Sequence, residues 1–279
     1  MREAPDDVRS PFVASFDCLT FLTDYGLEDG FVAACHGVAS RIVPGIRIID
    51  ITHLVPPGDV RRGAAVLAQT IPYLPVGVHV AVVDPGVGTA RRPILVEAAG
   101  QYFVGPDNGV LSMVYACAKH KVRTIANERY FRQPVSATFH GRDIFAPVAA
   151  HLAAGVPPAR MGKPIEDYLR PEFAKPRRSG ERTFSGSILK IDRFGNVVTN
   201  FHVRDFPDLC GTDAFVCQPT MTIGRRKIAA LARNYAACSP DVLFLIVGSS
   251  GYLEVSVNQG SAAKQLGCAA GQPVKLTMG

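Results

Sequence analysis

Two carboxylates stand directly after apolar segments in the first half of the chain. Asp24 ends the segment 18–24, and Asp84 follows the segment 78–83. If both segments are parallel strands of one open sheet, the two side chains lie beyond its carboxyl edge, where such sheets bind ligands. Carboxylates in that position can hold the two hydroxyls of a ribose, bind a metal ion or orient a nucleophile. The alternative is that each one only caps the helix that follows.

A histidine stands in a short irregular stretch before a predicted helix. His140 lies in the sequence Phe-His-Gly-Arg-Asp of residues 139–143. An imidazole there is suited to proton transfer or to orienting a nucleophile, and the alternative is a loop residue without a function. The other histidines form no HxH or HExxH motif, so we expect no dedicated metal site. A single carboxylate-bound Mg²⁺ stays open.

The glycines after Asp84 resemble a phosphate-binding loop, but the match is poor. Gly86 and Gly88 would need a third glycine at the position of Arg91 to complete GxGxxG, and no Gly-Lys-Ser/Thr follows. The segment also leads into a predicted strand, so no helix N-terminus is available for a phosphate. A nicotinamide dinucleotide or ATP site is therefore disfavoured.

Two turns in the second half carry side chains suited to a small ligand. Residues 192–200 contain Phe194, which can stack on a base, and Asn196, whose amide can pair with its donor and acceptor edge. In residues 248–258, Ser249 and Ser250 can bind a carboxylate and Glu254 an ammonium group. Each segment is also explained as an ordinary hairpin turn, and for residues 192–200 both interpretations can hold together.

The first half must supply the elements that position these residues. Apolar periodicity predicts strands over 18–24, 46–51, 78–83, 93–97, 102–104 and 122–126, and helices over 30–42, 59–70, about 109–118 and 143–154. The leading strand–helix–strand–helix–strand order is typical of a parallel sheet. We therefore predict an α/β domain with a mostly parallel sheet over residues 16–170.

The second half differs from the first in composition and in the length of its apolar segments. The proline-rich, charged region after Gly155 predicts a surface connection, and we place the linker at residues 171–185. Short β-like segments separated by Gly, Asn, Asp, Ser and Pro follow at close intervals. They cover residues 186–192, 197–199, 214–218, 220–223, 242–247, 252–257 and 273–276. We predict a smaller, barrel-like all-β domain over residues 186–279.

Composition excludes several classes of protein. Hydrophobic residues make up 47% of the 279 residues and charged residues 19%, which excludes a disordered chain. No apolar run reaches the length of a membrane span, and the first twenty residues show no signal peptide. The net charge of +6 is spread along the chain, so we expect no nucleic-acid partner. The seven cysteines form no CxxC pair, and we expect reduced thiols and a cytoplasmic protein.

Several of these segments, taken together and in order, carry a resemblance. They are Thr-Asp-Tyr-Gly-Leu-Glu-Asp (23–29), Asp-Pro-Gly-Val-Gly-Thr-Ala-Arg (84–91), Gly-Pro-Asp-Asn-Gly (105–109) and the segments 139–143, 192–200 and 249–258. From about Cys18 to the C-terminus the chain closely resembles the S-adenosyl-L-methionine hydrolases, also called SAM hydroxide adenosyltransferases, which are related to fluorinases and chlorinases. The resemblance implies a homotrimer whose active sites lie at subunit interfaces. It also implies that water or hydroxide attacks ribose C5′ of S-adenosylmethionine, which gives adenosine and L-methionine without a cofactor.

The resemblance also assigns residues. It implies a catalytic set of Asp84, Arg91 and His140 that positions the nucleophile, and a ribose clamp at Asp24. It implies an adenine-binding turn with Phe194 and Asn196. Further binding residues follow, with Asp29, Ser249, Ser250 and Glu254 near the methionine end or its rim and Val257 and Asn258 near the base.

Two alternatives stay open at this point. In the halogenating relatives the position of Asp84 is uncharged and the position of Gly141 carries a small residue lining the halide pocket. A carboxylate there repels a halide, so a chlorinase-like 5′-halogenase is disfavoured. The chain also lacks the fluorinase loop after Thr89, has Val198 where halogenases place Trp, and has Gly58 in place of an aromatic residue. A non-catalytic adenosine- or S-adenosylmethionine-binding protein would keep the ribose and base contacts without needing the whole catalytic set.

Overall fold

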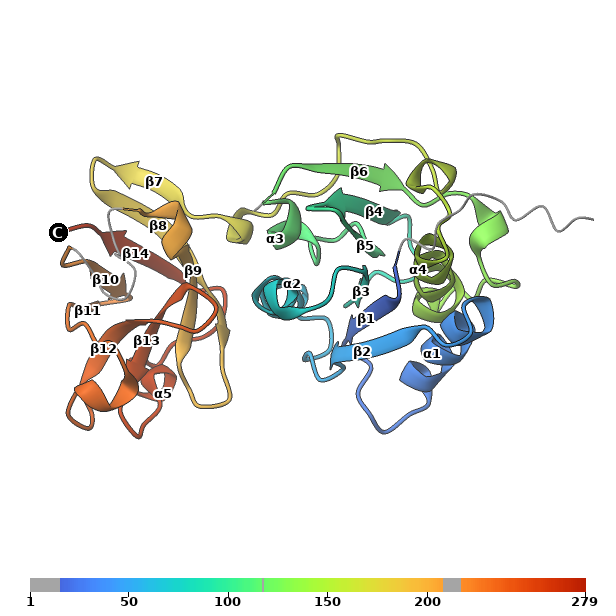
Figure 1. The fold of residues 1–279 in the computed structure, drawn as a ribbon. Coiled ribbons are helices and arrows are strands. Elements are labelled where there is room, and N and C mark those ends of the chain that lie inside the picture. Colours follow the sequence, from blue (N-terminus) through green and yellow to red (C-terminus); the bar gives the residue numbers. More distant parts are fainter. Residues whose placement is uncertain (1–15, 117, 208–216) are drawn as a thin grey trace, which may run out of the picture. The chain divides into compact units, whose positions relative to one another are not determined.

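The computed structural model describes residues 16–116, 118–207 and 217–279 of the chain. It divides into two compact units, one ending at Leu169 and one beginning at Arg170 (Figure 1). The segment 171–185, predicted as a linker, contains β7 (Arg177–Gly180) and the first residues of β8 (Thr183–Ile191). Each unit is described by itself.

The N-terminal unit is built on a six-stranded sheet in the order β2-β1-β3-β5-β4-β6. The strands are β1 (Cys18–Thr23), β2 (Arg47–Thr52), β3 (Val78–Val82), β4 (Pro93–Ala98), β5 (Gln101–Pro106) and β6 (His120–Thr124). Pairing is parallel from β2 through β1 and β3 to β5, and antiparallel where β4 meets β5 and β6. This confirms the predicted mostly parallel sheet.

Helices cover both faces of this sheet (Figure 1). On one face α1 (Phe31–Ile42) and α4 (Ala146–Ala153) pack against alternate residues of β1 and β3, such as Phe21. On the other face α2 (Val60–Thr70) packs against the residues between them, such as Leu22, and α3 (Ser112–Tyr115) packs against α2 and β4. Strands buried on both faces explain the continuous apolar segments of the sequence.

The ends of the helices differ from the sequence prediction in two places. α2 begins as expected, because Asp59 accepts a hydrogen bond from the Arg62 N–H at 3.0 Å and so caps the helix. α3 is only four residues long and stops before Ala116. The helix expected over 143–154 begins earlier, as the π-helical turn η3 (Gly141–Phe145), which runs directly into α4.

The C-terminal unit is an antiparallel, barrel-like sheet in the order β11-β10-β14-β8-β9-β13-β12, with β7 paired to β8. Besides β7 and β8 its strands are β9 (Val197–His202), β10 (Thr220–Ile223), β11 (Arg226–Ile228), β12 (Leu243–Val247), β13 (Tyr252–Val257) and β14 (Pro273–Thr277). A large apolar core fills it, with α5 (Ala262–Leu266) at its side, and Ala232, Phe244 and Ile246 form a small second cluster. The barrel prediction is confirmed. The strand expected over 214–218 falls largely on residues 214–216, which lie outside the described part of the chain.

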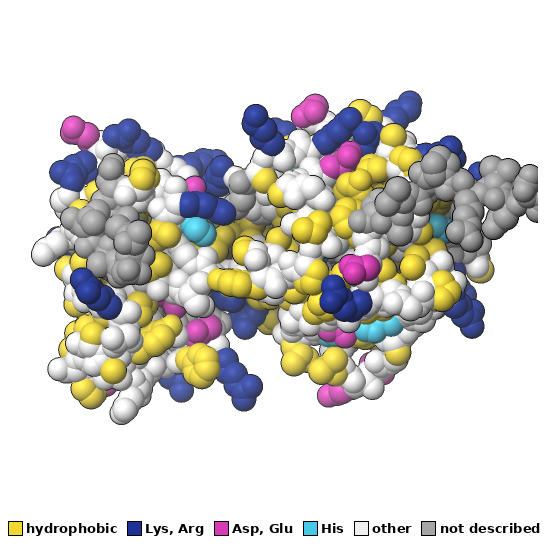
Figure 2. Space-filling view, in the orientation of Figure 1, with side chains coloured by type: hydrophobic (Ala, Val, Ile, Leu, Met, Phe, Trp, Pro, Cys, Tyr) yellow, Lys and Arg dark blue, Asp and Glu magenta, His cyan; other side chains and the backbone are white. Residues whose placement is uncertain are grey.

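Surface features agree with the composition. Figure 2 shows Lys and Arg side chains spread among acidic and hydrophobic ones on the visible face, without one continuous basic patch. Among the helices of the described residues, none combines the length and the apolar character needed to span a membrane. The five cysteines whose surroundings are described are all free thiols.

Candidate active site

Two carboxylates lie at the carboxyl edge of the parallel sheet. Asp24 follows β1 and Asp84 follows β3, and these strands are adjacent, with Thr23 paired to Val82. Asp24 caps no helix; its Oδ2 accepts a hydrogen bond from the Gly58 N–H at 2.8 Å. Burial raises the pKa of Asp24, and the negative charge of nearby Asp84 raises it further. A ligand that supplies positive charge or hydroxyl donors would therefore stabilise the charged form of Asp24.

Asp84 forms a buried ion pair with Arg91. Arg91 Nε lies 3.0 Å from both carboxylate oxygens, and Nη2 donates to Oδ2. The two side chains are only 5% and 9% exposed, respectively. The loop between them turns at Gly88, which has a φ of +77° and lies so close to the Ala137 carbonyl that a Cβ would overlap it. The geometry of the loop therefore brings the Arg91 side chain back to the carboxylate of Asp84.

His140 completes a chain of three polar side chains. Its Nδ1 lies 2.7 Å from Arg91 Nη2. Because a guanidinium only donates, Nδ1 accepts, and the neutral ring carries its proton on Nε2. Burial lowers the pKa of His140, and the positive charge of Arg91 lowers it further. The result is a neutral imidazole whose Nε2–H has no partner within the described part of the chain, beside a carboxylate held by Arg91.

The surroundings of this chain fix its members. The Phe145 ring lies under the Arg91 guanidinium, with 5.4 Å between Cζ and the ring centroid. Fully buried Asp143 accepts hydrogen bonds from the Arg132 and Arg142 side chains and from the backbone N–H of Ser136, which ties the loop before η3 to the helix. These contacts set the position of His140 at the start of η3.

In the C-terminal unit, Asp192 organises the turn between β8 and β9. Its Oδ1 accepts hydrogen bonds at 2.9 Å from the backbone N–H groups of Phe194 and Asn196, and its Oδ2 accepts one from Asn196 Nδ2 at 2.9 Å. Phe194 is 78% exposed, whereas Asn196 is 5% exposed. The turn therefore presents an open aromatic ring beside an amide held in one orientation, which suits stacking and edge recognition of a base.

Glu254 is a buried carboxylate in the middle of β13. Its Oε2 accepts a hydrogen bond from the Tyr235 hydroxyl at 3.4 Å, and its carboxylate lies against Gly248. Burial raises the pKa of Glu254 to about 7, and the charge of Asp192 adds to the effect. A cation next to this group would restore the charged form, as expected of a binding site for an ammonium group.

The expected base and methionine contacts lie at opposite ends of β13. β13 pairs with β9 in the antiparallel sense, so its C-terminal end, at Val257 and Asn258, lies near the turn 192–196. Ser249 and Ser250 precede its N-terminal end. Six strand residues span roughly 17–20 Å, so an extended ligand can have its two ends at the two turns. The Val257 side chain packs in the barrel core, and Asn258 Nδ2 donates to the Cys238 carbonyl at 2.9 Å.

Both halves of the chain match models of one protein family. Residues 19–162 match the SAM hydroxide adenosyltransferase N-terminal domain, and residues 186–275 match the C-terminal domain of the same family. The chain belongs to the SAM hydroxide adenosyltransferase family. An (R)-S-adenosyl-L-methionine hydrolase of Salinispora arenicola is 46% identical over 96% of this chain and 100% of that protein.

More distant relatives of this chain include halogenating enzymes. A fluorinase of Actinoplanes is 31% identical over 67% of this chain and 72% of its own. Among solved structures, an uncharacterized conserved protein from Thermotoga maritima superposes with a TM-score of 0.81 at 37% identity, covering 93% of this chain and 99% of that one. The hydrolase is the nearer of the two enzymes in identity and in coverage.

Three contacts of the expected binding residues and their neighbours were not predicted from the sequence. Tyr25 packs its hydroxyl over Gly141 so closely that a Cβ there would overlap it, and Gly58 holds Asp24 through its backbone N–H. Tyr235 bonds Glu254 across 19 residues of sequence. No local spacing signals these contacts, because each joins segments that only the fold brings together. Asp29, which was expected near the methionine end or its rim, is exposed just before α1.

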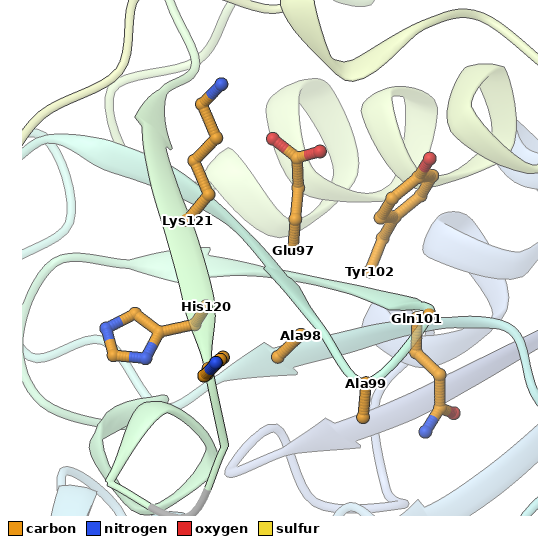
Figure 3. Close-up of a pocket in the computed structure, with 9 residues that line it drawn as sticks. Glu97, Ala98, Ala99, Gln101, Tyr102, His120 and Lys121 are labelled. Carbon is orange, nitrogen blue, oxygen red and sulfur yellow. The ribbon is translucent and has the colours of Figure 1, made fainter.

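One surface pocket lies away from the residues of the candidate site. It is lined by the β4–β5 turn and the start of β6 (Figure 3). Glu97, Tyr102 and Lys121 project from one face of these strands. Because β5 runs parallel to β3, the turn before β5 lies at the amino edge of the sheet, opposite to Asp84. This pocket therefore takes no part in the candidate site.

Proposed function

We propose that the chain is an adenosine-forming S-adenosyl-L-methionine hydrolase. The single observation that carries the proposal is the hydrogen-bonded chain Asp84–Arg91–His140, with its buried Asp84–Arg91 ion pair, at the carboxyl edge of the sheet. The full-length hydrolase relative supports the same reaction, and its name suggests the (R) configuration at sulfur for the substrate. The reaction forms a C5′–O bond while the C5′–S bond breaks.

Each residue near this edge has its own role in the proposed reaction. Asp84 accepts a hydrogen bond from the attacking water, Arg91 fixes the carboxylate, and His140 offers its Nε2–H to the same oxygen. The electrons of the broken C5′–S bond stay on sulfur, which leaves as the uncharged thioether of methionine, and the proton that the attacking water loses is released to solvent. Because a sulfonium is already a good leaving group, the chain needs only to align the nucleophile behind C5′, and no cofactor is assigned.

The remaining side chains bind the substrate. In this proposal Asp24 accepts hydrogen bonds from the ribose hydroxyls, and Phe194 and Asn196 hold the adenine, with Val257 and Asn258 beside it. Ser249, Ser250 and Glu254 bind the methionine end, and Asp29 lies at its rim. The raised pKa values of Asp24 and Glu254 agree with carboxylates whose charged forms are stabilised by the hydroxyl donors or the cation of a bound substrate.

A product assay tests the reaction. Purified protein is incubated with the separate (R) and (S) epimers of S-adenosylmethionine, and adenosine and methionine are followed by chromatography. Wild type and the control Asp17→Ala, whose side chain is 88% exposed, should form adenosine, while Asp84→Ala and His140→Ala should lose at least about a hundredfold in rate. Equal rates for all four proteins would refute the assignment.

The same assay separates the alternatives. With chloride or fluoride added, 5′-halo-adenosine would identify a halogenase in place of a hydrolase. Binding of S-adenosylmethionine without any product would identify a binding protein. Adenosine as the sole nucleoside product, with or without halide, supports the hydrolase.

We also propose a homotrimer with active sites at its subunit interfaces. Light scattering should give the mass of three chains. Asp84→Ala and Asn196→Ala change different units of the chain, so in mixed trimers made by co-expression about a quarter of the shared sites would carry neither change. Recovery of activity in the mixture supports shared sites, and no recovery, with each variant inactive alone, contradicts them.

We place the protein in the cytoplasm, without nucleic-acid or membrane partners. The free thiols of the five described cysteines agree with a reducing compartment. Cell fractionation with an antibody to the chain tests this placement, and recovery in a membrane or secreted fraction would contradict it.

A further inference from the structure

Three potential metal ligands meet beside the carboxyl end of β2. His36 lies on α1, Asp50 lies on β2, and His53 follows that strand. His36 Nε2 donates to Asp50 Oδ1 at 3.0 Å, and His53 Nε2 lies 3.0 Å from the same oxygen. One ligand atom of each residue lies within 4.8 Å of the other two. Sequence spacing could not reveal this cluster, because its members come from a helix, a strand and a loop.

His53 has a buried nitrogen without a hydrogen-bond partner. Its side chain is 3% exposed, and its Nδ1 lies 2.8 Å from Thr23 Oγ1. Nε2 is close to Asp50 Oδ1 but outside hydrogen-bond geometry, so it stays unsatisfied among the described residues. Leaving such a group buried and unpaired costs free energy. When Nδ1–H donates to Thr23, the Nε2 lone pair faces the cluster, as it does in histidines that bind metals.

We propose that His36, Asp50 and His53 bind one divalent ion of the Zn²⁺ class. Two imidazoles and one carboxylate form a donor set that suits zinc and its neighbours better than Mg²⁺ or Ca²⁺. Bonds of about 2.0–2.1 Å in a tetrahedron place ligand atoms about 3.3 Å apart. Both His36 Nε2 and His53 Nε2 lie 3.0 Å from Asp50 Oδ1, so binding requires little movement there. His36 and Asp50 are partly exposed, which leaves a path for the ion and room for a water as fourth ligand.

The ion would brace the loop that carries Asp24. His53 contacts Thr23 through its side chain, and its carbonyl accepts a hydrogen bond from the Gly26 N–H at 2.9 Å. Fixing His53 therefore fixes the two ends of the segment 23–26. The role is structural, and it does not depend on the proposed reaction.

Metal binding to the full-length chain, freed of any histidine tag and of metal by chelation, tests the proposal. Zn²⁺ is titrated against a chromogenic indicator, and Co²⁺ is added separately so that its visible spectrum reports the ligands. Wild type and the control His151→Gln, which lies on α4, should each bind one equivalent, while His36→Gln and Asp50→Asn should bind at least about tenfold more weakly. Circular dichroism of the metal-free variants checks that they fold.

Two results would overturn the proposal. One is affinity in His36→Gln and Asp50→Asn equal to that of wild type; the other is a Co²⁺ spectrum dominated by thiolate bands that the variants keep. Hydrogen–deuterium exchange tests the bracing role. Exchange at the Gly26 amide should slow with zinc in wild type and not in Asp50→Asn, and unchanged exchange in zinc-loaded wild type would contradict it.

Discussion

Replacing Glu254 by Gln should stabilise the protein at alkaline pH and leave it almost unchanged at acidic pH. Glu254 is 7% exposed on β13, and burial together with the charge of Asp192 raises its pKa from 4.5 to about 7. The folded chain therefore holds this proton more tightly than the unfolded chain does. Gln keeps an oxygen that can accept the Tyr235 hydrogen bond, but it carries no charge to bury.

The sign and size follow from proton linkage. Between pH 4.5 and 7 the folded state binds more protons at this group than the unfolded state, so wild type loses stability as the pH rises. The two pKa values differ by about 2.5, and each pH unit corresponds to about 1.4 kcal/mol, which gives about 3 kcal/mol in total. Glu254→Gln should thus be more stable than wild type by about 3 kcal/mol at pH 8, and by less than about 1 kcal/mol at pH 5.

Guanidinium unfolding of the full chain at pH 5 and pH 8, followed by circular dichroism, measures this difference. Glu181→Gln is the matched control, because Glu181 is exposed in the same unit, and it should change stability little at either pH. Using the difference between variant and wild type removes the contribution of the other titrating groups. A Glu254→Gln advantage that is equal at both pH values, or absent at pH 8, would refute the buried-carboxylate reasoning.

The remaining predictions concern the N-terminal unit. Arg91→Met should lower the free energy of unfolding by about 3–5 kcal/mol, because it leaves the buried Asp84 carboxylate without its positively charged partner. Adding Asp84→Asn should recover most of that loss, and a double variant as unstable as Arg91→Met alone would contradict the ion-pair explanation. Gly141→Ala should lower stability by about 1–3 kcal/mol and slow adenosine formation, because the new Cβ displaces Tyr25 beside Asp24. Wild-type melting temperature and rate in Gly141→Ala would show that this contact is not needed.

The alternating strands and helices of the N-terminal unit were predictable because they obey strong, local rules. Strands such as β3 are apolar on both faces except at His79, and the apolar residues of α1 recur at helical spacing. The prediction missed β7 and β11, whose residues are mostly exposed and charged. These strands form because backbone hydrogen bonds to a neighbour hold them in place. Apolar patterning therefore gives little sign of such edge strands.

The candidate site was predictable only in part. The meeting of Asp24 and Asp84 follows from topology alone, because parallel neighbours in a sheet end at one edge. The contact of Arg91 with His140 spans 49 residues and could be expected only from the family resemblance. The Tyr235–Glu254 contact escaped both arguments, since it depends on how an irregular loop packs on β13.

The charges of these sites also suggest how the proposed product would leave. The chain has a net charge of +6, yet partly buried Asp24 and buried Glu254 are carboxylates whose pKa values are raised in the absence of a cation. S-adenosylmethionine brings a sulfonium and an ammonium group, and each relieves part of this electrostatic cost. Attack at C5′ turns the sulfonium into a neutral thioether, so one of the two attractions disappears in the same step that forms adenosine. Tight binding of the cationic substrate is then compatible with release of the products, because the chemical step itself removes the charge that held them.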